Sequence, residues 1–243
     1  IVIEGLAKQW LQGNPWDEAA VVVRREASEA FNQGSFRAAA PLFHTLEARV
    51  SGGQKPLYRA LGELALGYGL WEQFHYRQAW EKLKTSLKAL DMASLWGGPP
   101  GLKARLPLIK ANSGFLERLV LDPADVKDGV VLDLIAHAHR RAHVDHDHER
   151  AMVALVRALE SCAQRQLFKQ HKIKTWDVQP EQLPDAMCET CRTCYLDDVD
   201  GKYKLPLQSQ FRVLAGLGDQ MGQAFLRDWP KMKPLFDAAN HAV

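Results

Sequence analysis

The stretches FNQGSFRAAAPLF at Phe31–Phe43 and WEQFHYRQAWEKL at Trp71–Leu83 decide the fold class, because they resemble each other at an offset of 40 residues. The aligned pairs are Phe31 with Trp71, Gln33 with Gln73, Phe36 with Tyr76, Arg37 with Arg77, Ala39 with Ala79 and Phe43 with Leu83. Each stretch predicts two helices joined by a short turn that has an aromatic residue on both sides. Helix-turn-helix stacking of the tetratricopeptide kind and a plain helical bundle both fit this pattern. Two copies are too few for a free-standing solenoid, so we favour the bundle.

Helical periodicity continues on both sides of these stretches and predicts an all-α chain without a convincing strand. The expected helices lie at about 1–12, 16–33, 36–50, 57–74, 77–95, 102–121, 125–143, 148–169, 207–228 and 232–243. The run Trp96–Gly101 is the clearest break, and Trp229-Pro230 is expected to separate the last two helices. We therefore divide the chain into helix pairs at 1–101, connecting helices at 102–147 and a helical domain at 148–243.

The composition limits the partners that the chain can have. It has 31 basic and 29 acidic residues and a net charge of +2, so any contact with RNA must be local rather than a broad basic field. The four cysteines do not form the framework of a secreted scaffold, which predicts a cytoplasmic protein. No apolar run is long enough to span a bilayer, and we expect no contact with membranes. The chain begins at Ile1 without a methionine, which indicates a fragment.

The most specific motifs lie in the second half, where their order matters more than any single one. A long predicted helix contains Arg157, Glu160 and Gln164, and the segment Ile173-Lys174-Thr175-Trp176-Asp177-Val178 follows it. Then come Gly201-Lys202-Tyr203-Lys204-Leu205 and Leu214-Ala215-Gly216-Leu217-Gly218-Asp219. This order resembles the accessory proteins of type III CRISPR systems that combine a CARF sensor, a helical linker and a HEPN domain. The resemblance implies that 1–101 is the helical linker domain and that 148–243 is HEPN-like.

In that family the last helix contains the catalytic signature, an Arg-Asn pair followed a few residues later by a His. The matching positions are Ala239 and Asn240, so alanine stands where the arginine is expected, and the expected histidine would lie beyond Val243. Either the activity has been lost or an Arg→Ala change was engineered, and the sequence does not separate these explanations. The chain as it stands lacks a complete active site.

The resemblance implies a metal-independent endoribonuclease that acts on single-stranded RNA in antiviral defence. The RNA 2′-OH attacks the adjacent phosphate, the arginine stabilises the developing charge, and the histidine transfers a proton. The site is shared by two chains, which implies a homodimer, and no cofactor is needed. Cyclic oligoadenylate would be sensed only by a CARF domain upstream, since this chain has no stretch of that type.

Arg157 and Glu160 lie on consecutive turns of one helix, with Gln164 one turn further. One interpretation is a solvated helix face, on which these side chains interact with neighbours at i+3 and i+4. The other is that they point into the dimer cleft and position the catalytic helix. We favour the second reading on the resemblance. Arg141 and His146 also have the Arg, four residues, His spacing, but this short pattern arises easily by chance.

Two clusters have the spacing of metal ligands, although we predict no metal site. His139 and His143 lie at i and i+4 of one helix, where a solvated hinge is the simpler interpretation. Cys188, Cys191 and Cys194 provide three thiols but not the usual fourth ligand, for which His171 is a candidate. The alternatives to the ribonuclease are therefore a non-enzymatic helical adaptor, which Ala239 favours, and a metal-binding helical protein.

Overall fold

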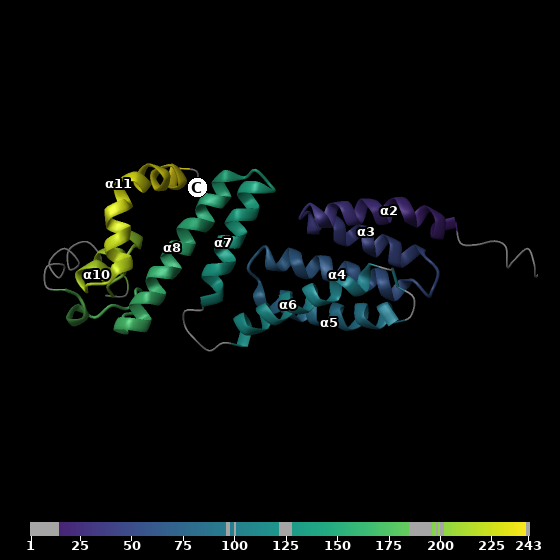
Figure 1. Ribbon diagram of the computed structural model, residues 1–243, viewed down its shortest axis with the longest axis horizontal. Coiled ribbons are helices and arrows are strands. Elements are labelled where there is room, and N and C mark those ends of the chain that lie inside the picture. The colour runs from purple at the N-terminus through teal and green to yellow at the C-terminus, as the bar shows by residue number, and fades with distance from the viewer. Residues whose placement is uncertain are drawn as a thin grey trace, which may run out of the picture. The chain divides into compact units, whose positions relative to one another are not determined.

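The computed structural model describes residues 15–95, 98–99, 101–121, 128–184, 196–197, 199 and 202–241, and these are almost all helical. Figure 1 shows the helices in chain order. Their bounds are α2 Pro15–Asn32, α3 Phe36–Arg49, α4 Lys55–Trp71, α5 Tyr76–Leu95, α6 Leu102–Leu121, α7 Asp128–His143, α8 His148–His171, η1 Pro180–Gln182, α10 Leu207–Gly216 and α11 Gln220–His241. Over this part of the chain there are isolated β-bridges but no strand, which confirms the all-α prediction.

The chain forms two compact units, Ile1–Asp122 and Pro123–Val243. Of the two helices that the sequence groups as a connecting segment, α6 packs on α5 in the first unit and α7 packs on α8 in the second. The expected helix at 1–12 lies outside the described residues. None of the described helices is both long and apolar enough to cross a membrane.

In the first unit, the two stretches that resemble each other form the same turn. The N–H of Gly34 donates to Phe31 O and that of Ser35 to Ala30 O, and 40 residues later Phe74 donates to Trp71 O and His75 to Leu70 O. Gly34 and Phe74 also both have a positive φ, 77° and 60° respectively. This conformation ends the first helix of each hairpin and reverses the chain direction. The internal resemblance is thus structural, with one hairpin made by α2 and α3 and the other by α4 and α5.

Small residues let the helices of this unit approach closely. Ala27, Ala39 and Ala65 are fully buried at the helix contacts, and Leu46 and Tyr58 fill the space between them. A Cβ on Gly67 of α4 would lie 2.4 Å from Leu83 Cδ1, so a larger residue there would force the side chain of Leu83 to shift.

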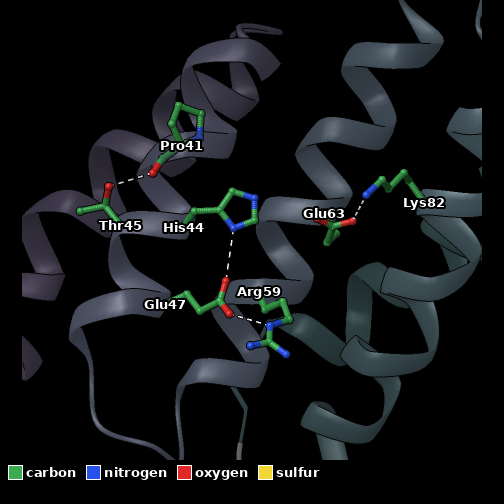
Figure 2. A network of polar contacts seen from close by, with 7 residues as sticks. All are labelled: Pro41, His44, Thr45, Glu47, Arg59, Glu63 and Lys82. Carbon is green, nitrogen blue, oxygen red and sulfur yellow. Dashed lines mark hydrogen bonds and ion pairs between the residues drawn. The ribbon is translucent and has the colours of Figure 1, made fainter.

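Polar side chains on α3, α4 and α5 tie these helices together, as Figure 2 shows. Glu47 is 3.2 Å from His44 Nδ1 and accepts a hydrogen bond of 2.5 Å from Arg59 Nε, and Lys82 pairs with Glu63. Partial burial raises the pKa of Glu47, but the hydrogen bonds from Arg59 and His44 outweigh it, so this pKa lies below its usual value. Glu47 is therefore ionised at neutral pH and links α3 to α4.

In the second unit the core lies where the end of α8 meets α10 and α11. Ala163 and Leu167 of α8 pack with Phe211 of α10 and Phe225 of α11, and the two phenylalanine rings stack with centroids 3.7 Å apart. A Cβ on Gly222 would lie 2.4 Å from the backbone nitrogen of Ala215, so α11 needs glycine there to pack against α10. This contact fixes the direction in which α11 leaves the core.

The prediction of a helix break at Trp229-Pro230 is wrong. The helix ends earlier, at Gly216, and Gly218 has a φ of 81° that reverses the chain. Asp219 then caps α11 by accepting hydrogen bonds from the N–H groups of Met221 and Gly222. Pro230 lies inside α11 and bends it rather than ending it (Figure 1).

Candidate functional site

Arg157 and Glu160 lie in the middle of α8, as predicted, and share one stripe with Gln164 at i, i+3 and i+7. Arg157 is exposed and Glu160 is half-buried. Neither side chain forms an ion pair or hydrogen bond with another residue that the structure describes.

A second face of α8 borders an apolar groove of about 370 Å³ between α7, α8 and α11. Its lining is almost entirely carbon and comes from Val131, Ile135, Met152, Leu155, Val156, Ala158, Leu159, Cys162, Met232, Leu235 and Phe236. Ile135, Leu155 and Leu235 are 47%, 41% and 54% exposed, although they are large apolar residues. Large apolar side chains that are exposed together along one groove are a feature of interaction sites.

Ala239 and Asn240 lie in the last turn of α11, a part of that helix where only the backbone is described. Asn240 follows Phe236 by four residues, which is about one helical turn. The structure thus brings the last turn of α11 next to the groove. It does not bring Arg157 and Glu160 there, since the α8 residues that line the groove lie on the other side of that helix.

The motif Ile173-Lys174-Thr175-Trp176-Asp177-Val178 has a structural role. Ile173, Thr175 and Val178 are buried, with exposed fractions of 1%, 4% and 2%. The N–H of Leu205 donates to Thr175 O, and the N–H of Val178 donates to Tyr203 O. The two motifs that follow α8 therefore bind each other and hold the end of α8 in the core.

Asp219 connects the same region to α11. Its Oδ2 accepts a hydrogen bond of 2.7 Å from Gln166 of α8, while its Oδ1 caps α11. Burial raises the pKa of Asp219, but the hydrogen bonds from Gln166, Gly222 and Met221 and the charge of His171 outweigh it, so this pKa lies below its usual value. The Leu-Gly-Asp motif thus fixes the start of the helix whose last turn contains Asn240.

Arg141 and His146 lie at the junction of α7 and α8. Arg141 Nη1 donates to Asp145 Oδ2 at 2.7 Å and its Nε to His137 Nε2 at 3.3 Å, so its guanidinium is held by neighbours on its own helix and turn. His146 is exposed and has a φ of 55°. This geometry is that of a helix end rather than of a site built for a phosphate.

Of the two weak metal candidates, the structure describes only one. The rings of His139 and His143 lie next to each other with centroids 4.3 Å apart. Within the described ranges no group of three or more His, Cys, Asp or Glu side chains has the arrangement of a metal site. Cys188, Cys191 and Cys194 lie outside those ranges, so their role stays a prediction.

Two family models match the chain along most of its length. The Csm6 6H domain matches residues 20–116, and the Csm6 HEPN domain matches residues 126–243. These matches coincide with the two compact units. No curated protein and no solved structure matches the chain.

The matched domains define a HEPN protein of the ribonuclease type. The chain belongs to the Csm6-like proteins of type III CRISPR systems, with its 6H domain followed by its HEPN domain.

The sequence reasoning missed the groove. Its signal was present as apolar residues that recur on the outer side of α7, α8 and α11, but the same spacing is expected of a face buried inside one chain. Only the packing of the three helices shows that Ile135, Leu155 and Leu235 are left uncovered.

Proposed function

We propose that this protein is an endoribonuclease of CRISPR-associated antiviral defence, which cleaves single-stranded RNA without a metal and as a homodimer. The match of residues 126–243 to the Csm6 HEPN domain carries the proposal. Cyclic oligoadenylate is not assigned to this chain, because its sensing would belong to a CARF domain and the family models that match here are the 6H and HEPN domains.

The chemistry follows from the RNA itself. The 2′-oxygen attacks the adjacent phosphorus, the bond from phosphorus to the 5′-oxygen breaks, and a 2′,3′-cyclic phosphate and a 5′-hydroxyl remain. A general base takes the proton of the 2′-OH, and a general acid gives one to the leaving oxygen. An arginine at position 239 would stabilise the charge on the phosphate, which Ala239 does not do.

The apolar groove supports the homodimer. It lies on α11 one turn before Ala239 and Asn240, and its exposed residues Leu155 and Leu235 would be covered by the same surface of a second copy. A two-fold contact there places two copies of the last turn of α11 near each other. This arrangement is what a shared catalytic site requires.

The test compares cleavage of a fluorescent single-stranded RNA by three proteins, each with a segment that contains the expected histidine joined after Val243. One has Ala239, one has Ala239→Arg, and the control has Ala238→Arg, which adds the same charge at another angle of the same helix. We expect cleavage only with Ala239→Arg, unchanged by EDTA and absent on DNA of the same sequence. A folded, dimeric Ala239→Arg protein without activity would refute the ribonuclease and favour the helical adaptor.

Arg157 and Glu160 are proposed as positioning residues on the resemblance alone, since both lie on the side of α8 away from the groove. In the Ala239→Arg protein, Arg157→Ala and Glu160→Gln should lower kcat by about tenfold or more without changing the dimer mass, because neither residue lines the groove. The conservative change Arg157→Lys should recover part of kcat. An unchanged kcat for both variants would assign these residues to a solvated face.

A further inference from the structure

The positive charge of this protein is concentrated in two helices. Residues 76–121, which form α5, α6 and their connection, contain eight Lys or Arg and three Asp or Glu, which gives a net charge of +5. Residues 15–71, which form α2 to α4, have six of each, and residues 123–243 have 16 basic and 17 acidic side chains. The excess of positive charge therefore belongs to one helical hairpin and not to the protein as a whole.

Most of these cations are directed to solvent. Lys82 is paired with Glu63 (Figure 2), and Arg105, although exposed, lines a pocket of the first unit. The other six are exposed and form no ion pair with a residue that the structure describes; they are Arg77, Lys84, Lys88, Lys103, Lys110 and Arg118. We call these six residues the basic face.

The spacing of the basic face follows the helices. Arg77, Lys84 and Lys88 recur at i, i+7 and i+11 and form one stripe of α5, on the side away from the buried Leu83 and Leu90. On α6, Lys103 and Lys110 recur at i and i+7. Like charges such as those of Lys84 and Lys88, at i and i+4, repel and destabilise a helix by a few tenths of a kcal/mol, about 0.2–0.5. Helix stability therefore does not explain this pattern.

Cations of the two helices lie at the same level of the hairpin. The short connection 96–101 requires α6 to run back along α5, on which it packs. Lys88 lies seven residues before the end of α5 and Lys110 eight residues after the start of α6. At about 1.5 Å per residue both lie about 11 Å from the connection, hence at the same level of the hairpin.

We infer that the basic face binds the phosphate backbone of single-stranded RNA and holds the substrate on the 6H domain. This inference rests on the proposed function, since it takes the RNA as substrate. A strand of RNA presents phosphates in a row, which suits cations repeated along two adjacent helices. The contact is local, as a net charge of only +2 demands.

The test measures binding rather than cleavage, with the chain as it stands. A fluorescein-labelled, unstructured single-stranded RNA is titrated with protein in an anisotropy assay between about 50 and 200 mM NaCl. We expect Lys88→Glu with Lys110→Glu to weaken binding by about tenfold or more and to reduce the salt slope by about 1.4, or about 0.7 for each lost phosphate contact. The control, Arg24→Glu with Lys55→Glu, makes the same change of charge on exposed residues of α2 and α4 and should leave binding within about twofold.

Equal losses in both double variants would overturn the inference, because only the net charge would then matter. An unchanged affinity of the Lys88 and Lys110 variant, or tighter binding of this chain to phosphatidylserine vesicles than to RNA, would overturn it as well. The two proposals fail separately. RNA binding that depends on the basic face, without cleavage by the Ala239→Arg protein, would refute only the ribonuclease. Cleavage without dependence on the basic face would refute only this inference.

Discussion

Gly34 and Phe74 have the same place in the two hairpins of the first unit, and both have a positive φ angle. At Gly34 this conformation costs little, because glycine has no Cβ. At Phe74 the same conformation strains an L-residue by about 1–2 kcal/mol. The ring of Phe74 makes an edge contact with Tyr76 at 6.1 Å, which offsets part of that cost.

Gly34→Ala should therefore destabilise the protein by about 1 kcal/mol, although nothing lies within 4 Å of the added Cβ. Gly114 is the control, since it lies inside α6 with equally open space around its Cβ and an ordinary φ. Gly114→Ala should stabilise the protein by up to about 1 kcal/mol, because alanine is the better helix former. Urea unfolding of both variants measures the difference, and effects of the same sign would contradict this reading of the turn.

Glu47 provides a prediction that depends on pH. Because its pKa is lowered in the folded protein, its contribution is fully present above the pKa of the unfolded chain and is lost as the pH falls through the folded value. Glu47→Gln should thus lower stability at pH 7 by about 0.5–1 kcal/mol, and the difference should shrink below about pH 4. Thermal melts of both proteins across this range test it. Glu29→Gln, in an exposed pair with Arg25, should have the smaller effect at pH 7.

At the scale of the element, α11 depends on a cap at its start more than on its prolines. Asp219 satisfies two N–H groups of the first turn and also binds Gln166 of α8. Its replacement removes a cap and a contact between helices, both of which form only on folding.

Asp219→Ala should cost about 1–2 kcal/mol of unfolding free energy. Asp228→Ala is the matched control on the same helix, because Asp228 pairs only with its exposed neighbour Arg227 among the residues described. We expect that variant to unfold at nearly the same urea concentration as the parent. Equal midpoints for the two variants would show that Asp219 is not the cap on which α11 depends.

The elements also show how far one sequence predicts a fold. The bounds of α6 are the predicted ones, Leu102–Leu121. The prediction succeeds because apolar residues recur about every 3.6 residues and the Gly-Pro run before them is a clear signal of a helix break. The break between α10 and α11 was misplaced, since Pro230 is the stronger local signal and Gly218-Asp219 is a weaker one. Bending relieves the clash of the Pro230 ring with the preceding turn of the helix, and whether a helix bends or ends depends on packing that local sequence does not reveal.

The candidate site has the same limit. The spacing of Arg157, Glu160 and Gln164 predicts that they share a stripe, and they do. Which neighbour that stripe faces depends on how α8 packs. The side of α8 that borders the groove contains Leu155 and Leu159 instead. The assignment of Ala239 and Asn240 to the catalytic signature rests on the resemblance, because no physical pattern in the sequence points to these two positions.

At the scale of the whole molecule, the groove predicts the state of association. Leu235→Asp places a charge in a surface that the second copy should cover, so the variant should have the mass of one chain where the parent has that of two. Val22→Asp is the control, because Val22 is 61% exposed on α2 of the other unit. Light scattering after size exclusion distinguishes the two. A parent protein with the mass of one chain at micromolar concentration would contradict the homodimer.

The equivalent turns of the two hairpins have a consequence for how the first unit can change in length during evolution. Unequal recombination between the copies would join equivalent turn positions, since Gly34 and Phe74 are 40 residues apart with the same backbone hydrogen bonds. The product would gain or lose one whole hairpin in frame and would keep every turn intact. Length variation among relatives should therefore occur here in steps of a complete hairpin, while the HEPN domain keeps its length.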